Sequence, residues 1–554
     1  MPADARLAVA DPETVRLRLR DGTELAADIH RPAGPGRYPV LLMRQPYGRA
    51  IASTLTLAHP AWYAAHGYVV VVQDVRGRGD SGGAFRLFET EAEDGAETLA
   101  WAADLPGSTG QVATYGFSYQ AVTQFLALAG AARAGTKRPD AMVPSMGGWT
   151  IRDDWAFTGG AFGLSGNLGW ACQMGAEAAR LAGDAEAFAA LGAAARGAPW
   201  GGPVPARPEV LARYAHHTHY ADWLADAAAT WDAIAPSRNL AGHALDVPAL
   251  HVGGWQDFLL EGTLGAHAAF VKDASFAKGP ARQHLLVGPW AHSPWGSRVG
   301  GVDLGRQAIS DVDARTVAFL DHVLKGRGAA QPAVRLFDVG ARAWLDLPEW
   351  PDPAPTPLYL ASDGLAATAS GGGLERAPGR AGTDHLVHDP WRPAPILGGA
   401  WGMPAGHQDR AALDDRSDVA VYTSPPMTVP CRLAGWVEAE VHVETRAASH
   451  DLHATLSVVG LDGRAITLTA GHLRVFDPAA PGPRRIALRA ACCTLQPGQR
   501  LRLSLQAAAW PAFAVNPGTG AAPEAVGPQD ARVITLAIRH GADRPSRLLL
   551  PFLG

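Results

Sequence analysis

The sequence predicts a mainly parallel α/β domain that is interrupted by a helical insertion and followed by a β domain of sandwich or jelly-roll type. Strand-like apolar runs alternate with helix-like stretches over 1–140 and again over 241–328. Alanine-rich helical patterns replace them over 141–240. Residues 333–554 carry many short segments that alternate apolar and polar side chains, as strands with one buried face do. These observations predict a core in two parts, a cap and a C-terminal domain.

Two kinds of strand pattern open the chain. Residues 14–31 alternate apolar and polar around Asp21-Gly22, which predicts an antiparallel hairpin. The Val-rich runs Pro39–Met43 and Tyr68–Gln73 suit strands that are buried on both faces. The other elements expected before the insertion are helices at Thr54–His66, at Glu91–Leu105 and after Ser118, and a strand at Gln111–Tyr115.

The pattern changes in the insertion and then returns to strand–helix–strand order. Helices of the insertion are expected at Ala176–Arg196, Pro208–Tyr214 and Tyr220–Ile234. The second part of the core predicts strands at Val247–Val252 and His284–Val287 and helices at Thr263–Ala274 and Asp311–Leu324. After the linker Lys325–Pro332, strands are expected at Trp436–Val443, Leu452–Val459, Arg485–Arg489 and Leu501–Leu505, and loops at Pro351–Pro357 and Ser370–Thr383.

The composition limits the class of protein. Of 554 residues, 47% are hydrophobic and 18% charged, so the chain can bury enough apolar surface to fold and a disordered chain is excluded. The formal net charge is −5 without a basic patch, which argues against a nucleic-acid partner. Four cysteines without a CxxC pair predict neither a disulfide framework nor a zinc site. No apolar leader or uncharged 18-residue apolar run is present, so we expect a cytoplasmic protein without a membrane segment.

The segment Gly116-Phe117-Ser118-Tyr119-Gln120 lies between a predicted strand and an apolar helix. A serine at such a turn is held in a strained backbone that lifts its Oγ clear of the sheet, where it can act as a nucleophile. The first glycine of the G-x-S-x-G pattern is present, Gln120 replaces the second, and the small residue Ala121 follows. The same serine could be an ordinary helix N-cap, so the motif alone does not decide.

Two further residues complete a set of catalytic groups. A nucleophilic serine needs a base, and the base needs an acid that orients it. In an α/β-hydrolase they follow in the order serine, acid, histidine, each just after a strand. Asp257 follows the strand Val247–Val252, and His292 follows the strand His284–Val287. The order and the strand-end positions together predict a triad with Ser118.

Several motifs, taken together, resemble those of one family. They are MRQPYGR at 43–49, VVVQDVRGRGDSGG at 70–83, Glu91 and Asp94 before Trp101, then YGFSYQ, GGWQDF and GPWAHS, and finally Trp510-Pro511, NPGTG at 516–520 and PSRLLLP. In this order, over essentially the whole chain, they are similar to the cocaine-esterase-like hydrolases, which include α-amino acid ester hydrolases and X-Pro dipeptidyl peptidases. The resemblance implies an α/β-hydrolase core, an inserted helical cap and a C-terminal jelly roll.

The resemblance also implies roles by position. It implies Ser118 as nucleophile, His292 as general base, Asp257 as orienting acid, and the Tyr47 hydroxyl and the Tyr119 backbone N–H as oxyanion donors. It implies no metal and no cofactor. The chain departs from the family in the elbow, where glycine often stands three residues after the serine and Ala121 stands here. One methyl group tightens the packing of helix on strand but leaves the nucleophile in place.

Substrate class depends on the residues around the triad. In the amino acid ester hydrolases two acids follow the triad aspartate, whereas Asp257 precedes the apolar Phe258-Leu259-Leu260. An ammonium group there would lack a charge partner, so an apolar or aromatic acyl group is expected. Glu261 is the nearest acid and more simply structural; a cap acid, Asp153 or Asp154, could fold over the pocket instead. The expected pocket residues are Phe258, Trp149, Trp155 and Trp170, with core packing of the cap as the alternative for each tryptophan.

Two weaker patterns have simpler explanations. Gly77–Gly82 fits GxGxxG after a strand, which can cradle a pyrophosphate. It contains Asp80, which would repel phosphate, and no helix begins directly after it, so an ordinary loop is favoured. His216, His217 and His219 could bind a metal, but neighbouring histidines on a helix point about 100° apart. A single site would need an irregular turn, and a polar face of a cap helix is expected instead.

Two classes of function follow. The first is a serine hydrolase that cleaves carboxylic esters, or amides, through an acyl-enzyme on Ser118, with X-Pro dipeptidyl peptidase and α-amino acid ester hydrolase as alternatives within the class. The second is a non-catalytic binding protein that uses the C-terminal domain. The intact order of the triad favours the first. The expected partner is a small ester or amide, with no nucleic acid and no membrane, and the sequence does not define the oligomeric state.

Overall fold

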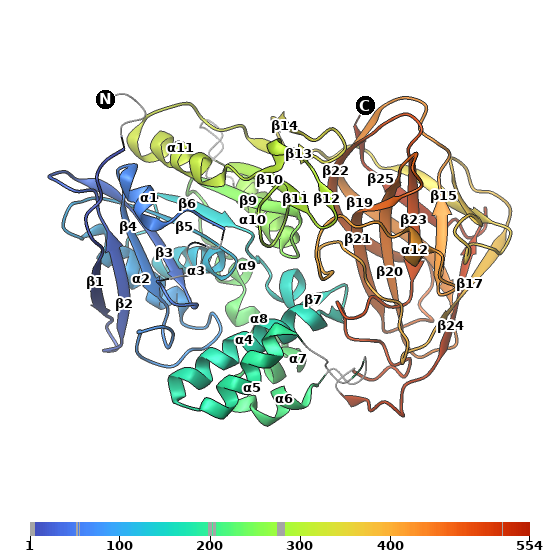
Figure 1. The fold of residues 1–554 in the computed structure, drawn as a ribbon, viewed down its shortest axis with the longest axis horizontal. Coiled ribbons are helices and arrows are strands. Elements are labelled where there is room, and N and C mark those ends of the chain that lie inside the picture. Colours follow the sequence, from blue (N-terminus) through green and yellow to red (C-terminus); the bar gives the residue numbers. More distant parts are fainter. Residues whose placement is uncertain are drawn as a thin grey trace.

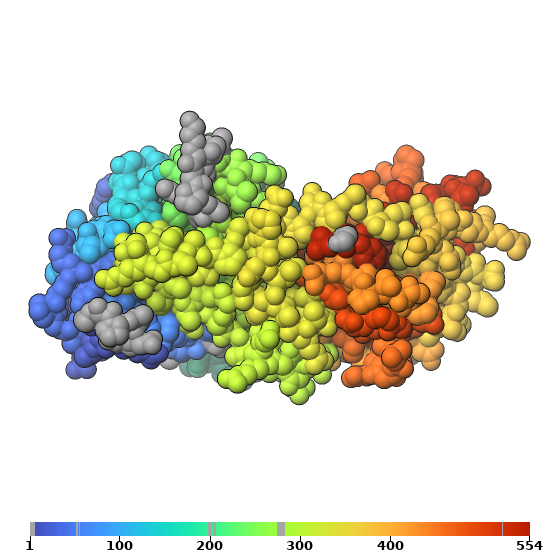
Figure 2. All heavy atoms as spheres, turned by 90° about the horizontal axis from the view of Figure 1, so that it is seen from above, coloured from blue at the N-terminus to red at the C-terminus, as the bar shows by residue number. Residues whose placement is uncertain are grey.

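The protein folds into an α/β lobe, a group of helices beside it, and a β lobe formed by the last third of the chain (Figure 1). The structure is a computed structural model, and it describes residues 6–50, 54, 56–197, 202, 207–273, 283–522 and 525–553. The two lobes meet along a broad junction that the yellow part of the chain crosses (Figure 2). The α/β core and the separate C-terminal β domain that the sequence predicts are therefore confirmed.

A ten-stranded sheet forms the centre of the first lobe, in the order β1-β2-β4-β3-β5-β6-β9-β10-β13-β14. The strands from β4 to β13 pair in parallel, and the pairs β1–β2, β2–β4 and β13–β14 are antiparallel. The strands span Glu13–Arg18, Glu24–His30, Tyr38–Gln45 (β3), Val69–Asp74 (β4), Ser108–Phe117 (β5), Ala141–Ser145 (β6), Ala249–Gln256 (β9), Gln283–Ala291 (β10), Val334–Asp338 (β13) and Ala343–Leu347 (β14). Because the central strands are parallel, their carboxyl ends share one edge.

Helices cover both faces of this sheet. The helices are α1 (Pro60–Ala65), α2 (Glu91–Ala103), α3 (Tyr119–Ala134), α10 (Leu260–Lys272) and α11 (Val312–Lys325). Successive residues of β3 face opposite sides: Val40 and Leu42 pack with α2 and α3, whereas Leu41 and Met43 pack with α1 and α11. A strand buried on both faces needs apolar residues at every position, which explains the continuous apolar run in the sequence.

The helical insertion lies between β6 and β9. Its helices are α4 (Leu164–Ala182), α5 (Ala185–Arg196), α6 (Glu209–Arg213), α7 (Tyr220–Leu224), α8 (Ala228–Ile234) and α9 (Pro236–Asn239). The single helix predicted over 176–196 is wrong, because Gly183 ends α4 in a left-handed conformation (φ 75°) and the Asp184 side chain caps α5 by accepting from Ala187 N. The insertion also begins later than residue 141, since β6 belongs to the central sheet.

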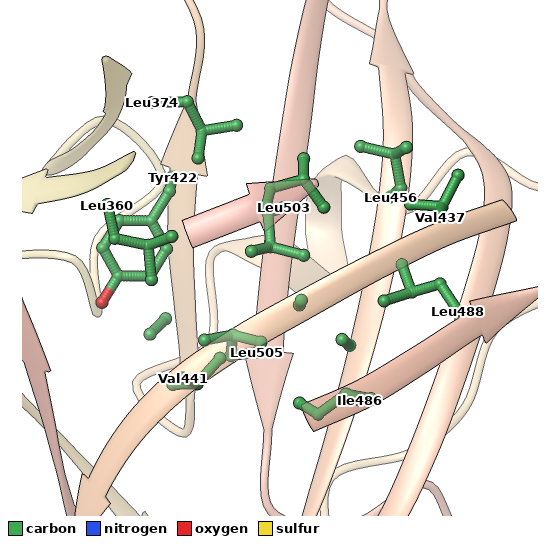
Figure 3. Packing of buried hydrophobic residues seen from close by; sticks show 14 of the residues in the cluster. Leu360, Leu374, Tyr422, Val437, Val441, Leu456, Ile486, Leu488, Leu503 and Leu505 are labelled. Carbon is green, nitrogen blue, oxygen red and sulfur yellow. The ribbon is translucent and has the colours of Figure 1, made fainter. Parts of the chain in front are cut away.

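The C-terminal domain is a twelve-stranded β structure. It contains β15 (Thr356–Ser362), β16 (Gly372–Glu375), β17 (Gly382–His388), β18 (Val419–Thr423), β19 (Cys431–Glu444), β20 (His450–Val459), β21 (Ala465–Val475), β22 (Arg484–Leu495), β23 (Arg500–Gln506), β24 (Ile534–His540), β25 (Arg547–Leu550) and β26 (Phe552–Leu553). Figure 3 shows its apolar core, in which Val437 and Val441 of β19 pack with Leu456 and Leu503 from β20 and β23.

Two expectations for the last part of the chain need correction. Strands β13 and β14 lie beyond the linker yet extend the central sheet, so the C-terminal domain begins after residue 347 and not at 333. The segment 370–383, expected as a loop, contains β16, whose Gly372 and Gly373 pair with β15 and β18. Glycine weakens the strand signal in a sequence, which is why the pattern did not show it.

The three parts are joined by hydrogen bonds that cross their boundaries. The cap binds the C-terminal domain through Arg474 N donating to Gly159 O (2.8 Å) and Leu164 N donating to Ala512 O (2.7 Å). The core binds it through Gln256 Nε2, which donates to Leu468 O at 2.9 Å. None of the helices in the described residues combines the length and apolar character that a bilayer crossing requires.

Candidate active site

Ser118 stands at the turn between β5 and α3. Its backbone has φ 64° and ψ −124°, a conformation that non-glycine residues rarely adopt. Gly116 before it has φ 141°, and a Cβ there would lie 2.5 Å from Gln120 Cβ. Gln120 uses its side chain inside the turn, because its Oε1 accepts from Phe117 N at 2.9 Å. The turn is therefore a strained elbow, and not an ordinary helix N-cap, since the Ser118 side chain makes no capping hydrogen bond.

The departure from the family pattern at Ala121 is accommodated by a glycine elsewhere. A Cβ built on Gly147, in the loop after β6, would lie 2.6 Å from the Ala121 Cβ. The methyl group that the helix gains is thus matched by a methyl group that the facing loop lacks. Helix α3 can therefore approach the loop after β6 closely without a glycine at position 121.

Ser118, His292 and Asp257 form one hydrogen-bonded chain at the carboxyl edge of the sheet. Ser118 Oγ lies 3.0 Å from His292 Nε2, and His292 Nδ1 lies 2.7 Å from Asp257 Oδ1. Asp257 is fully buried after β9, and its N–H donates to Gly254 O. This geometry places the Nδ1 proton against the carboxylate and leaves Nε2 to accept from the serine hydroxyl. The structure brings together the three groups that the strand order predicts.

Aromatic groups fix the orientation of His292. Its ring lies 4.9 Å from the Phe117 ring and 4.6 Å from the Phe258 ring, centroid to centroid. The Trp295 indole N–H donates to the His292 carbonyl at 3.0 Å. The imidazole is therefore held by packing as well as by Asp257, which keeps Nε2 directed at Ser118 Oγ.

Tyr47 lies beside Ser118 in the turn after β3. Its N–H donates to Gln45 Oε1 at 2.8 Å, and its hydroxyl oxygen accepts from the Trp170 indole N–H at 3.3 Å. Burial raises the pKa of Tyr47 to about 12, although the Trp170 and Ser118 hydrogen bonds act in the opposite direction. Its hydroxyl consequently stays protonated and can donate to an oxyanion.

Tyr119 offers its backbone and not its side chain. It is the first residue of α3, so its N–H has no acceptor within the helix. Its hydroxyl donates to the buried Glu91 carboxylate at 2.8 Å, and Glu91 also pairs with Arg44 at 2.7 Å. The side chain is thus committed away from the site, while the N–H stands next to the Ser118 Oγ.

A cavity of about 1090 Å³ opens in front of Ser118 and His292. Among the described residues, no aspartate or glutamate lines it, and Arg298 is its one charged residue besides the histidine. The insertion contributes Trp155 and Trp170, whose rings pack edge to face with centroids 5.1 Å apart. The cavity is therefore an apolar chamber with a single cation at its wall.

Three of the four predicted pocket residues line the cavity. Trp155, Trp170 and Phe258 line the cavity, and so does Leu259. Trp149 does not: it packs against Phe125 and Phe270 beneath the sheet edge, with centroids 5.4 and 6.2 Å away. Leu260 is likewise in the core, because α10 begins there and turns that side chain inward.

Sequence reasoning missed the contribution of the C-terminal domain. Residues 400–405, which include Trp401 and Met403, line the cavity. They are held in place by the pairing of Gly300 with His407, in which Gly301 N donates to His407 O at 2.8 Å. These residues carry no motif and follow no strand of the core, so the sequence offered no signal for them.

None of the three acids considered as ammonium partners lines the cavity. Asp154 is half-buried and accepts from the N–H groups of Trp149 and Thr150, at 2.7 and 2.6 Å. Asp153 is exposed and pairs with Arg152. Glu261 forms an ion pair with Arg489 of the C-terminal domain, at 2.5 Å, so its role is structural.

The glycine-rich loop 77–82 encloses a carboxylate and not a phosphate. Asp74, fully buried at the end of β4, accepts from Arg49 N and Arg49 Nη1, each at 2.7 Å. A Cβ at Gly79 would lie 2.1 Å from Asp74 Oδ2, so only glycine lets the loop close over this group. The Arg49–Asp74 pair fixes the turn that carries Tyr47.

The histidine cluster divides in two. His216 and His217 lie in a short 3-10 turn with ring centroids 4.1 Å apart, and Asp184 lies within reach of both, the three candidate ligand atoms being within 4.8 Å of one another. His217 Nε2 is 3.2 Å from Asp184 Oδ2, so His217 and Asp184 already have each other as partners without a metal ion. His219 lies apart, against the Phe85 ring.

The fold and the site define a serine hydrolase built on the α/β-hydrolase core. Residues 21–294 match the X-Pro dipeptidyl-peptidase (S15) family, and residues 327–549 match the X-Pro dipeptidyl-peptidase C-terminal non-catalytic domain. The chain is 30% identical to cocaine esterase of Rhodococcus sp. (strain MB1 Bresler), over 99% of each chain. The chain therefore belongs to the family of cocaine-esterase-like hydrolases.

Solved structures show the same fold over almost the whole chain. An aminopeptidase from a Thaumarchaeota archaeon superposes with a TM-score of 0.80 at 22% identity, covering 98% of this chain and 97% of that one. An α-amino acid ester hydrolase superposes with a TM-score of 0.73 at 22% identity, covering 100% and 98%. A CocE/NonD family hydrolase from Staphylococcus aureus gives 0.67 at 18% identity, covering 98% and 94%. The likeness in fold therefore extends over both lobes of this chain.

Proposed function

We propose that this protein hydrolyses carboxylic esters with an apolar or aromatic acyl group, through an acyl-enzyme on Ser118. The observation that carries the proposal is the hydrogen-bonded chain from Ser118 through His292 to Asp257, which opens on a cavity without a carboxylate in the described residues. The reaction requires a small ester and water, and its place in the cytoplasm stays a prediction. Similarity to a cocaine esterase supports the ester over other substrates.

Each group has one task in the proposed reaction. His292 Nε2 takes the Ser118 proton while Oγ attacks the ester carbonyl, and Asp257 stabilises the imidazolium that forms. The carbonyl oxygen becomes an oxyanion that accepts from the Tyr47 hydroxyl and the Tyr119 N–H. His292 then gives the proton to the departing alcohol. In the second half of the reaction His292 takes a proton from water, the water oxygen attacks the acyl-enzyme carbonyl, and the acid leaves as Ser118 regains its proton.

The apolar wall supports the acyl preference. An acyl group that packs against the indoles of Trp155 and Trp170 in the cavity wall loses contact with water and meets apolar ring surface. Burying apolar area yields about 25 cal/mol per Å². A free α-amine in the same place would lose its hydration without gaining a carboxylate.

Amide or peptide cleavage remains the second candidate activity, because the S15 match names X-Pro dipeptidyl peptidases. Those reactions use the same triad, so substrate tests must separate them. A p-nitrophenyl acyl ester and a dipeptidyl-proline p-nitroanilide should be compared on the wild type and on Ser118→Ala. We expect the ester to be cleaved faster and both activities to vanish in the variant.

A fluorophosphonate probe distinguishes the hydrolase from a non-catalytic binding protein. Only an activated serine reacts with it, so the wild type should be labelled at Ser118 and the Ser118→Ala variant should not. An unlabelled wild type with normal folding would overturn the proposal.

A further inference from the structure

Arg78 is a buried guanidinium without a carboxylate partner. It lies in the loop after β4 and is only 2% exposed. Nη1 donates to Met174 O at 3.0 Å, and the guanidinium lies 3.9 Å from the Phe85 ring centroid. Its Nε has no acceptor, and no carboxylate stands within 4.0 Å of it among the residues that the structure describes. Other buried arginines do have such partners, namely Arg44 with Glu91, Arg410 with Asp414 and Arg474 with Asp451.

An unpaired buried cation is costly, so its retention calls for a reason. Removing a charge from water without a counterion costs several kcal/mol, and folded proteins usually pair such groups. Burial lowers the pKa of Arg78 to about 10, which still leaves it charged at neutral pH. The carboxylate whose charge reaches it, Glu177, is engaged with Arg180 at 2.8 Å.

Arg78 is connected through α4 to the Tyr47 hydroxyl, the proposed side-chain donor of the oxyanion site. It holds the carbonyl of Met174 in α4, and one helical turn earlier Trp170 donates to the Tyr47 hydroxyl oxygen. The Phe85 ring beneath Arg78 lies 6.2 Å from the Tyr119 ring. The positive charge of Arg78 also lowers the pKa of Tyr47, against the larger effect of burial.

We propose that Arg78 is a positioning residue for the oxyanion site, which acts through Tyr47: it fixes the part of α4 that holds the Tyr47 hydroxyl, and its charge strengthens that hydroxyl as a donor. Electrons from Ser118 Oγ move to the carbonyl oxygen, the serine proton moves to His292, and Arg78 exchanges no proton. The inference rests on the proposed function, because it needs an oxyanion that Tyr47 binds.

The design of the test uses the dependence on Tyr47. Arg78→Met keeps the apolar stem and removes the charge, and we expect kcat to fall about 10-fold with KM within twofold, because the charge matters when the oxyanion forms. In a Tyr47→Phe background the same change should lower kcat less than about threefold, since the hydroxyl that transmits the effect is gone. Arg213→Met, which removes an exposed arginine of the same insertion that pairs with Glu186, is the matched control and should leave kcat unchanged.

The pH dependence of kcat in Arg78→Lys is a readout that should not change if Arg78 has only a structural role. A buried lysine has a lowered pKa, so kcat of this variant should decline as pH rises through that pKa between pH 6 and 9, while the wild type shows no such decline. This variant keeps the question open to experiment if Arg78→Met does not fold. A Ser118→Ala enzyme assayed beside it reports separately on the proposed function.

The outcomes are distinct. Equal losses of kcat from Arg78→Met with and without the Tyr47 hydroxyl, or a rise in KM alone, would mean that Arg78 only anchors the loop to α4, and the inference would be overturned. An Arg78→Lys pH profile identical to that of the wild type would overturn it too. Activity that persists in Ser118→Ala would instead refute the proposed function.

Discussion

The charge of the acyl group should decide how fast this enzyme works. Phenylacetic acid methyl ester and phenylglycine methyl ester differ by one α-amine, so the pair isolates that effect. In the cavity the amine meets Phe258 and Leu259 and no carboxylate within the described part of the chain, while Arg298 contributes a like charge. We expect the neutral ester to have the higher kcat/KM.

The magnitude follows from the area that the acyl group buries. If the neutral benzyl group buries roughly 100 Å² that the ammonium form keeps hydrated, the difference is about 2.5 kcal/mol at 25 cal/mol per Å². A difference of that size corresponds to nearly two decades in kcat/KM. The ratio should narrow as pH rises and the amine loses its proton, because the neutral amine needs no counterion.

The assay measures kcat/KM for both esters from pH 6 to 9, on the wild type and on two variants of one residue. Leu259→Glu adds a carboxylate where the cavity has none, and Leu259→Gln adds the same bulk without charge. The ratio of kcat/KM for the amino ester to kcat/KM for the neutral ester should be about 10-fold higher in the glutamate variant than in the glutamine variant. A wild type that cleaves the protonated amino ester as well as the neutral one would refute the reasoning and favour the amino acid ester hydrolase alternative.

Three further expectations concern the oxyanion site, the elbow and stability. Tyr47→Phe should lower kcat by roughly 10²–10³ with little change in KM, as steady-state kinetics will show. Gly116→Ala should impair the fold, measured as a lower Tm, because its Cβ would lie 2.5 Å from Gln120 Cβ at a positive φ. His251 and His453 are buried, and desolvation holds each pKa well below 6.5. Below pH 6.5 these two histidines bind more protons in the unfolded chain than in the folded one. The free energy of unfolding should therefore keep their full contribution above pH 6.5 and decrease as the pH falls below that value.

The parts of the site that the sequence predicts are those tied to local pattern. Ser118, Asp257 and His292 each follow a strand with a clear apolar run, and parallel strands bring such positions to one edge. The break at Gly183 was missed because alanine-rich sequence continues across it, and only the left-handed cap shows where the helix ends. Trp149 was misplaced because a tryptophan near the site and one in the core look alike until the packing is known.

The cavity wall shows why the remaining residues of the site could not be predicted from the sequence. Its boundary is made where Gly300, soon after His292 in the chain, pairs with His407 of a different domain. Long-range contacts of this kind depend on how the finished domains dock, and no residue period encodes them. The C-terminal domain matches a non-catalytic type, and it contributes no group to the triad. It nevertheless supplies Trp401 and Met403 to the cavity in front of Ser118, so we expect changes there to alter KM and substrate range before they alter the chemistry at Ser118.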